Sequence, residues 1–120
     1  MKIKVIKREF TVCKVDSLER IDFSDKYCFV GKTDEEISLI CSTRHAPQET
    51  VSRSDGWRGF RIQGQLDFGL IGVISELTGI LARNKIGMLT VGTYNTDYVL
   101  VKEGDLEKAL LLLEDQDYKI

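Results

Sequence analysis

Residues 63–101 combine two kinds of group that could together hold a small zwitterion. The turn-prone run 64–69 leads directly into an expected helix from residue 70 to about residue 85, with Gly72 in its first turn. A helix start bracketed by glycines offers free backbone N–H groups to an anion. Asp97 follows a tight hairpin turn, and its carboxylate could hold a cation. The spacing therefore predicts a site for a molecule with both charges, such as an amino acid.

Each of these features also has a purely structural interpretation. Gly69 and Gly72 could serve only a tight strand-to-helix turn, because glycine reaches backbone conformations that other residues avoid. Asp97 could be a turn residue, since Asp and Asn favour turns through local hydrogen bonds. Tyr94 is either a wall of the pocket or an ordinary strand aromatic. The residue types alone leave both interpretations open.

Composition and charge limit the classes of function. The 120 residues suffice for one compact domain or for two small subdomains that share a core. A net charge of −2, from 17 basic and 19 acidic residues spread without long blocks, argues against nonspecific nucleic-acid binding. No apolar run is long enough to cross a membrane, and the opening residues alternate Lys with Ile and Val, which is typical of a strand. We therefore expect a soluble protein that contacts neither nucleic acid nor membrane.

The three cysteines indicate a reducing compartment. Cys13, Cys28 and Cys41 each lie in an apolar, strand-like run, where a thiol behaves as a small buried hydrophobe. Their wide spacing and the single His45 do not fit a zinc site, which favours close cysteine pairs. Reduced thiols without a secretory signal predict a cytoplasmic protein. We expect no cofactor and no metal.

The sequence offers little for catalysis. It contains no nucleophile beside a base, no paired carboxylates at catalytic spacing and no phosphate-binding loop with a lysine. His45 has no Cys or acidic neighbour in the sequence. Three arginines surround the loop before residue 57 and form either an anion-binding face or a solvated rim: Arg53, Arg58 and Arg61. The prediction is that the protein is not an enzyme.

An internal repeat organises the chain. Residues 28–40 and 89–101 align without a gap at an offset of 61, which places Gly31 on Gly92 and Glu36 on Asp97. Each copy consists of two short apolar strands around a polar reversal, which is the pattern of a β-hairpin. A further strand precedes each copy, at residues 10–15 in the first half and 57–63 in the second.

The helices are expected mainly in the second half. An apolar stripe predicts one helix there: Leu70, Ile74, Leu77 and Leu81. A second stripe predicts another helix, with Asp105 near its start: Leu106, Ala109, Leu110 and Leu113. The first half has room for one helical turn at 17–21 and for a short helix at 44–51 with Pro47 near its start. Residues 117–120 could add a last strand.

These elements predict an α+β fold built from two ferredoxin-like (βαββαβ) subdomains. Each would have an antiparallel sheet with its helices on one face, and the first would be abbreviated in both helices. The expected boundaries are 1–56 for the N-terminal subdomain and 57–120 for the C-terminal one. A half of about 60 residues buries little apolar surface alone, so we expect the two to pack together and the chain to form a homodimer.

The second half resembles an ACT domain. The resemblance depends on the glycine-flanked helix segment 69–82 and on the strands and hairpin of 86–101. These segments are similar to the ACT repeats of the animal cytosolic arginine sensor and to small bacterial tandem-ACT proteins, and ACT domains also form the regulatory part of aspartate kinases. The first half matches this architecture only weakly and is assigned mainly through the internal repeat.

The resemblance implies that an amino acid binds at an interface between two ACT units. Backbone groups of Leu70, Ile71 and Gly72 would meet the ligand's α-carboxylate. The hairpin residues Thr93, Tyr94 and Asn95 would line the pocket floor and meet its α-amino group, and Asp97 matches the arginine sensor's acidic residue. A regulated partner enzyme would fit this role. The alternative is a protein–protein interaction or oligomerisation domain without a ligand, which pairs through an exposed sheet edge.

Overall fold

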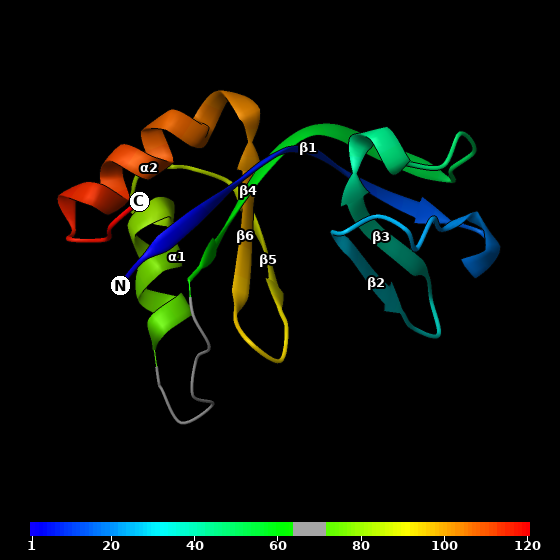
Figure 1. Cartoon of the computed structure of the whole chain (residues 1–120), viewed down its shortest axis with the longest axis horizontal. Helices are drawn as coiled ribbons and strands as arrows, with labels where there is room; N and C mark the ends of the chain where they lie inside the picture. Colours follow the sequence, from blue (N-terminus) through cyan, green and yellow to red (C-terminus); the bar gives the residue numbers. More distant parts are fainter. Residues whose placement is uncertain (64–71) are drawn as a thin grey trace. The chain divides into compact units, whose positions relative to one another are not determined.

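The computed structural model describes residues 1–63 and 72–120 (Figure 1). These residues form six strands, two α-helices in the second half and three short 3-10 turns. In chain order the elements are β1 Ile3–Val15, η1 Leu18–Arg20, β2 Cys28–Lys32, β3 Ile37–Ser42, η2 Thr43–His45, β4 Ser52–Ile62, α1 Val73–Arg83, β5 Met88–Gly92, β6 Asp97–Lys102, η3 Glu103–Asp105 and α2 Leu106–Asp115.

The strands follow the order β2-β3-β1-β4-β6-β5, and the chain divides into two compact units. The first, here called the helical unit, consists of Met1–Lys7 and Arg58–Ile120. The second, here called the strand unit, consists of Arg8–Trp57. β1 and β4 each pass from one unit into the other, so the N-terminal residues belong with the C-terminal half of the chain. The expected boundary between residues 56 and 57 stays a prediction.

The helical unit has a substantial apolar core. Both α-helices pack on the strands of this unit, and α1 and α2 contact one another (Figure 1). The helices contribute buried residues such as Leu77, Leu81 and Leu113, which meet Phe60 and Val99 from the strands. The apolar stripes in the sequence correctly predicted these helical positions, because residues three and four apart share one face of a helix.

The strand unit has a much smaller core. Its buried apolar cluster consists of Cys13, Val15, Ile21, Leu39 and Cys41, with Cys28 half-buried against it. The 3-10 turns η1 and η2 occupy the chain positions at which the helical unit has α1 and α2. The fold is thus mixed α and β with ferredoxin-like character. The strand unit has no α-helix among its residues, and its assignment as a second, abbreviated ferredoxin-like subdomain stays a prediction.

The two hairpins correspond at an offset of 60 residues, not 61. Met88 begins β5 as Cys28 begins β2, and Asp97 begins β6 as Ile37 begins β3. The turns agree with this register, since Thr93 N donates to Thr96 O as Thr33 N donates to Glu36 O. Alternate strand residues point to opposite faces, so the alignment at 61 matched each residue of one hairpin with a residue on the opposite face of the other.

Several element boundaries also differ from expectation. α1 begins at Val73, so Gly72 precedes the helix rather than lying in its first turn. The turn η2 ends before Pro47 instead of starting near it. Residues 117–120 form no last strand, and only an isolated bridge joins Lys119 to Lys2. The place beside β4, which a last strand of the βαββαβ pattern would occupy, is instead taken by the start of β1.

Candidate functional site

The turn between β5 and β6 is closed by its own polar atoms. Thr93 N donates to Thr96 O at 2.8 Å, and Thr93 Oγ1 donates to the same oxygen at 2.9 Å. Thr93 Oγ1 also lies 3.3 Å from Thr96 N, from which it can accept. The Thr93 side chain is therefore a structural part of the turn, and it fixes the hairpin shape that presents its neighbours.

Thr96 fastens this hairpin to β4. Its hydroxyl Oγ1 donates to Ile62 O at 2.8 Å, and the residue is only 7% exposed. Ile62 is the last residue of β4, shortly before the segment that leads to α1. Sequence reasoning placed Thr96 in the turn but assigned it no role. A buried hydroxyl needs a hydrogen-bond partner, and the polar neighbours Asn95 and Asp97 gave no sign in the sequence that Thr96 is buried.

Asp97 occupies the first position of β6, directly opposite Gly92 on β5. Its side chain is half-buried. A Cβ placed on Gly92 would lie 3.3 Å from Asp97 Oδ1, so the carboxylate lies close over the glycine backbone. Beside it, Tyr94 is 73% exposed and Asn95 is also exposed at the tip of the hairpin. The three predicted residues thus lie together, with a partly buried carboxylate and two outward-facing neighbours.

The start of α1 carries the left-handed glycine that the sequence suggested. Gly72 is the N-cap residue, with φ 83° and ψ 2°, and it provides no side-chain cap. The first helical hydrogen bond runs from Glu76 N to Gly72 O at 2.8 Å. The earlier amides of α1 have no partner within the helix, as at every helix start. Leu70 and Ile71, the other two residues predicted here, lie outside the described residues.

Helix start and hairpin lie at the same end of the helical unit. α1 begins at the end at which β5 turns into β6 (Figure 1). The N-terminus of a helix carries a partial positive charge of about half a unit. The Asp97 carboxylate supplies a negative charge at this same end of the unit. Electrostatically, the region has the two poles that a zwitterion requires.

The three arginines weighed as an anion-binding face have different surroundings. Arg53 Nε lies 3.0 Å from Asp55 Oδ1, and Arg61 Nη1 donates to Tyr98 Oη at 3.2 Å. The guanidinium of Arg61 also stands 5.9 Å from the centre of the Tyr98 ring. Arg58 Nε is buried and has no hydrogen-bond partner among residues 1–63 and 72–120. The contacts described for Arg53, Arg58 and Arg61 thus include no partner that all three share.

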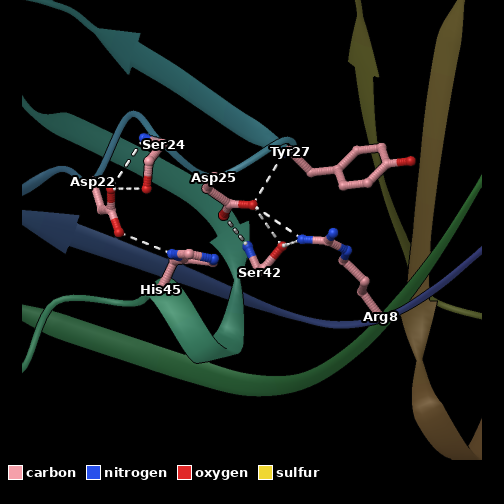
Figure 2. Close-up of polar contacts among 7 residues, drawn as sticks. All are labelled: Arg8, Asp22, Ser24, Asp25, Tyr27, Ser42 and His45. Atoms are coloured by element: carbon pink, nitrogen blue, oxygen red, sulfur yellow. Dashed lines mark hydrogen bonds and ion pairs between the residues drawn. The ribbon is translucent and has the colours of Figure 1, made fainter.

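His45 has an acidic partner that the sequence did not reveal. His45 Nδ1 lies 2.8 Å from Asp22 Oδ2, although 23 residues separate them (Figure 2). Hydrogen bonds from Ser24, and then from His45, lower the pKa of the Asp22 carboxyl to about 2. The carboxylate stands between the serine and the imidazole, so the imidazole is not placed to take the serine proton. This arrangement fastens a loop and is not a catalytic triad.

A second carboxylate secures the same loop from inside. Asp25 has a fully buried side chain, which accepts hydrogen bonds from Ser42 N and Ser42 Oγ, both at 2.7 Å, and from Tyr27 N at 3.1 Å (Figure 2). Arg8 Nη1 lies 3.5 Å from it, and its guanidinium stands over the Tyr27 ring at 5.2 Å. A buried charge needs such partners, so Asp25 has a structural role.

The rest of the described chain holds no competing site of the classes considered. Across residues 1–63 and 72–120, no helix is long and apolar enough to span a bilayer. The same residues contain no group of three or more His, Cys, Asp or Glu side chains that could hold a metal ion. A hollow of about 400 Å³ lies along the start of β1, but no predicted site residue lines it: Lys2, Ile3, Lys4, Val5, Lys7, Gln63 and Ile120.

Comparison with known proteins identifies the family. A family model of the ACT domain matches residues 52–115, which is more than half of the chain. The chain belongs to the ACT family. The matched span runs from the start of β4 to the end of α2 and includes every residue that the sequence predicted for the site. The resemblance seen in the second half is thereby confirmed, and the link to the arginine sensor stays a prediction.

Solved structures share the fold over nearly the whole chain. A protein from Agobacterium tumefaciens is 27% identical, with a TM-score of 0.85 over 98% of this chain and 90% of its own. A protein from Vibrio cholerae is 16% identical, with a TM-score of 0.73 over 95% of this chain and 88% of its own. The aspartate kinase of Clostridium acetobutylicum, an allosteric enzyme, is 12% identical, with a TM-score of 0.65 over 94% of this chain and 33% of its own. A search of curated proteins found no match.

Proposed function

We propose that this ACT protein is a non-catalytic regulatory module that binds an amino acid at an ACT–ACT interface. The observation that carries the proposal is the position of two opposite charges at the same end of the helical unit. The glycine-started helix α1 offers the positive pole, and Asp97 on β6 offers the negative one. Membership of the ACT family and a fold shared with an allosteric aspartate kinase support a regulatory role.

The ligand would be held mainly by main-chain groups. Its α-carboxylate would accept hydrogen bonds from the backbone around Leu70, Ile71 and Gly72, where a helix start attracts anions. Its α-amino group would meet the backbone of Thr93, Tyr94 and Asn95. The Asp97 carboxylate would then face the side chain and favour a basic one. Gly92 leaves this carboxylate room that a larger residue would take away.

A second ACT unit would complete the site and convert binding into a signal. Tyr94 and Asn95 are exposed at the hairpin tip, where a second copy of the chain could cover them together with the ligand. Contacts from two units favour the assembled state over the separated one, so ligand binding and association are coupled. A homodimer in the cytoplasm that controls a partner enzyme is the simplest form of such a module.

Thermal unfolding in the presence of each of the twenty amino acids, at millimolar concentration, tests the proposal. A ligand at a hundred times its dissociation constant stabilises the folded protein by about 2.7 kcal/mol. We expect one amino acid or a small group to raise the unfolding midpoint, and light scattering to report a larger assembly with the same compounds. A flat response to all twenty would contradict the proposal.

Two variants separate the charge of Asp97 from a general effect. Asp97→Asn keeps the size of the side chain and should remove any preference for basic over neutral amino acids. Asp34→Asn makes the same change in the turn of the other hairpin, which lies in the strand unit, and should leave the preference unaltered. Equal ligand preference in both variants would remove Asp97 from the site.

The second candidate is an interaction domain without a ligand. It is favoured by the strand order, because β2 and β5 are outermost and each has one strand neighbour. An exposed strand edge can pair with another chain. This candidate predicts a constant assembly size with and without amino acids, whereas the amino-acid module predicts a size that depends on the ligand.

A further inference from the structure

Two of the three cysteines lie directly opposite one another on neighbouring strands. Cys28, at the start of β2, is the register partner of Cys41 on β3. Both belong to the small core cluster of the strand unit, in which Cys41 is buried and Cys28 is half-buried. Directly opposite residues of an antiparallel pair place their side chains on the same face of the sheet.

Antiparallel strands contain two kinds of residue pair, and Cys28 and Cys41 form the kind in which the Cα atoms are closer together. The turn is closed by the hydrogen bond from Thr33 N to Glu36 O, which makes these two a hydrogen-bonded pair. Hydrogen-bonded and non-hydrogen-bonded pairs alternate along the ladder from there, through Lys32–Ile37 to Cys28–Cys41. The cysteines therefore occupy a non-hydrogen-bonded position, where the Cα atoms are about 4.5 Å apart. Disulfides span Cα distances of about 4.4–6.8 Å.

The third cysteine does not have this placement. Cys13 on β1 is the register partner of Leu39, and Cys41 is the partner of Thr11. Cys13 and Cys41 are thus diagonal neighbours, which in an antiparallel pair lie about 7–8 Å apart. Cysteines whose Cα atoms are more than about 7 Å apart cannot be bridged without movement of the backbone. Cys13 and Cys28 lie on strands that β3 separates, so Cys28–Cys41 is the one directly opposed pair among the three cysteines.

We propose that Cys28 and Cys41 are an oxidation site, at which a peroxide converts the two thiols into a disulfide across β2 and β3. The half-buried Cys28 reacts first: its thiolate attacks one peroxide oxygen, the O–O bond breaks, and a sulfenic acid and one water form. The Cys41 sulfur then attacks the Cys28 sulfur, and the S–O bond breaks to release a second water. The two thiols lose two electrons, which hydrogen peroxide accepts.

The surroundings make this reaction slow at neutral pH. Burial is the main cause that raises the pKa of the Cys28 thiol, and the negative charges of Asp25 and Asp22 add to it. Burial also raises the pKa of the Cys41 thiol to about 12. Its other neighbours are Cys13, Asp25 and Cys28, which raise the pKa further, and Arg53, which lowers it. Since the thiolate is the reacting form, the rate should rise about tenfold for each pH unit below these pKa values.

The bond would stabilise the strand unit. It would close the β2–β3 hairpin into a ring in a unit whose apolar core consists of few residues. Disulfides stabilise mainly by restricting the unfolded chain. Oxidation is therefore expected to raise the unfolding midpoint of this region by about 10 °C, and a reductant is expected to reverse the change.

Treatment of the full chain with hydrogen peroxide tests the assignment. Intact mass should fall by about two units, and peptide mapping should join the segments that carry Cys28 and Cys41. Cys28→Ser and Cys41→Ala should each abolish this loss, whereas Cys13→Ala should retain it as the matched control. The rate should increase about tenfold from pH 7 to pH 8.

Three results would overturn the proposal. One is a bridge that contains Cys13. Another is a gain of oxygen without loss of the two hydrogens, which would mean that the sulfenic acid finds no second thiol. The last is an unchanged mass at pH 8 after peroxide treatment, together with full reaction of the three thiols once the protein is unfolded, which would show that the folded strands keep the pair inert. None of these readings depends on amino-acid binding, so this proposal and the proposed function stand or fall separately.

Discussion

The hairpins β2–β3 and β5–β6 have the same strand lengths and the same turn closure, yet they offer different chemistry. At the strand pair next to the turn, β5–β6 has Gly92 opposite Asp97, whereas β2–β3 has Lys32 opposite Ile37. Where β5–β6 has a carboxylate close to a glycine, β2–β3 has an aliphatic side chain opposite a lysine. A shared backbone geometry therefore does not imply a shared site.

The elements around the hairpins differ as well. The helical unit supplies the glycine-started α1 near its hairpin, whereas the strand unit has only the 3-10 turn η1 at the corresponding place in the chain. A 3-10 turn of three residues has almost no macrodipole with which to attract an anion. Both poles of the candidate site thus occur in the helical unit, and one ligand per chain is expected.

The two units also reach their stability by different means. Among residues 1–63 and 72–120, twelve form the buried apolar cluster of the helical unit and five form that of the strand unit. The strand unit adds the buried hydrogen bonds of Asp25 and the pair of Asp22 with His45. Polar contacts thus take over part of the role that apolar packing has in the helical unit.

The largest effect is expected from a cavity in the larger core. Leu81→Ala removes a fully buried side chain on α1 and should lower the free energy of unfolding by about 2–5 kcal/mol in urea denaturation. Leu111→Ala on α2 is the control, because this leucine is 57% exposed and should change stability by less than about 0.5 kcal/mol. Similar values for the two variants would refute the assignment of this core.

The polar anchor of the strand unit should come next. Asp25→Ala leaves the buried amide of Ser42 without its acceptor and should cost about 2–3 kcal/mol of unfolding free energy. Hydrogen exchange should locate the loss in residues 8–57, while the amides of α1 keep their protection. If α1 lost protection to the same extent, the two units would not be separate in stability.

A smaller effect on stability is expected from loss of the hydrogen bond between the β5–β6 hairpin and β4. Thr96→Val keeps the shape of the side chain but leaves Ile62 O without its donor, which should cost about 1–3 kcal/mol. Glu36→Ala changes the corresponding exposed residue of the other hairpin and should have little effect on stability. The same Thr96 variant should weaken the response to amino acids, because the hairpin that presents Asp97 would move.

The smallest effect concerns pH. The pKa of Asp22 is about 2 in the folded protein against an ordinary value of 3.8, because Ser24 and His45 favour its charged form. Its contribution to stability is therefore fully present above about pH 4 and is lost as the pH falls toward 2. Asp22→Asn should remove this part of the pH dependence in acid unfolding curves. An unchanged curve between pH 4 and pH 2 would show that the pair contributes nothing.

Periodicity in the sequence predicted the elements better than their partners. The stripes that contain Leu77 and Ala109 identified both α-helices, because regular spacing depends only on local geometry. The hairpins were recognised, but the alignment of one with the other was off by one residue, since similar apolar residues align almost equally well at either offset. The pairing of residues 1–7 with the second half was missed because no local pattern encodes which strand lies beside which.

For the candidate site, the sequence located the hairpin and the glycine near the start of α1, and the role of these residues in binding stays a prediction. It could not identify Thr96, because its role depends on a carbonyl 34 residues away in β4. It also missed the pair of Asp22 with His45 and the enclosure of Asp25, which both join segments distant in the sequence. Contacts of this kind arise only when the chain has folded.

The sharing of β1 between the units has a consequence for synthesis on the ribosome. Residues 1–7 are translated before the strand unit but belong with a unit whose other residues begin at Arg58. Lys2 O therefore has no bond from Gln63 N, at 2.8 Å in the folded chain, until that later residue has been made. The strand unit, by contrast, is one unbroken stretch and can assemble while translation continues. In nascent chains of this protein, residues 8–57 should therefore fold first. Residues 1–7 should take their place in the sheet only after residues 58–120 have been synthesised.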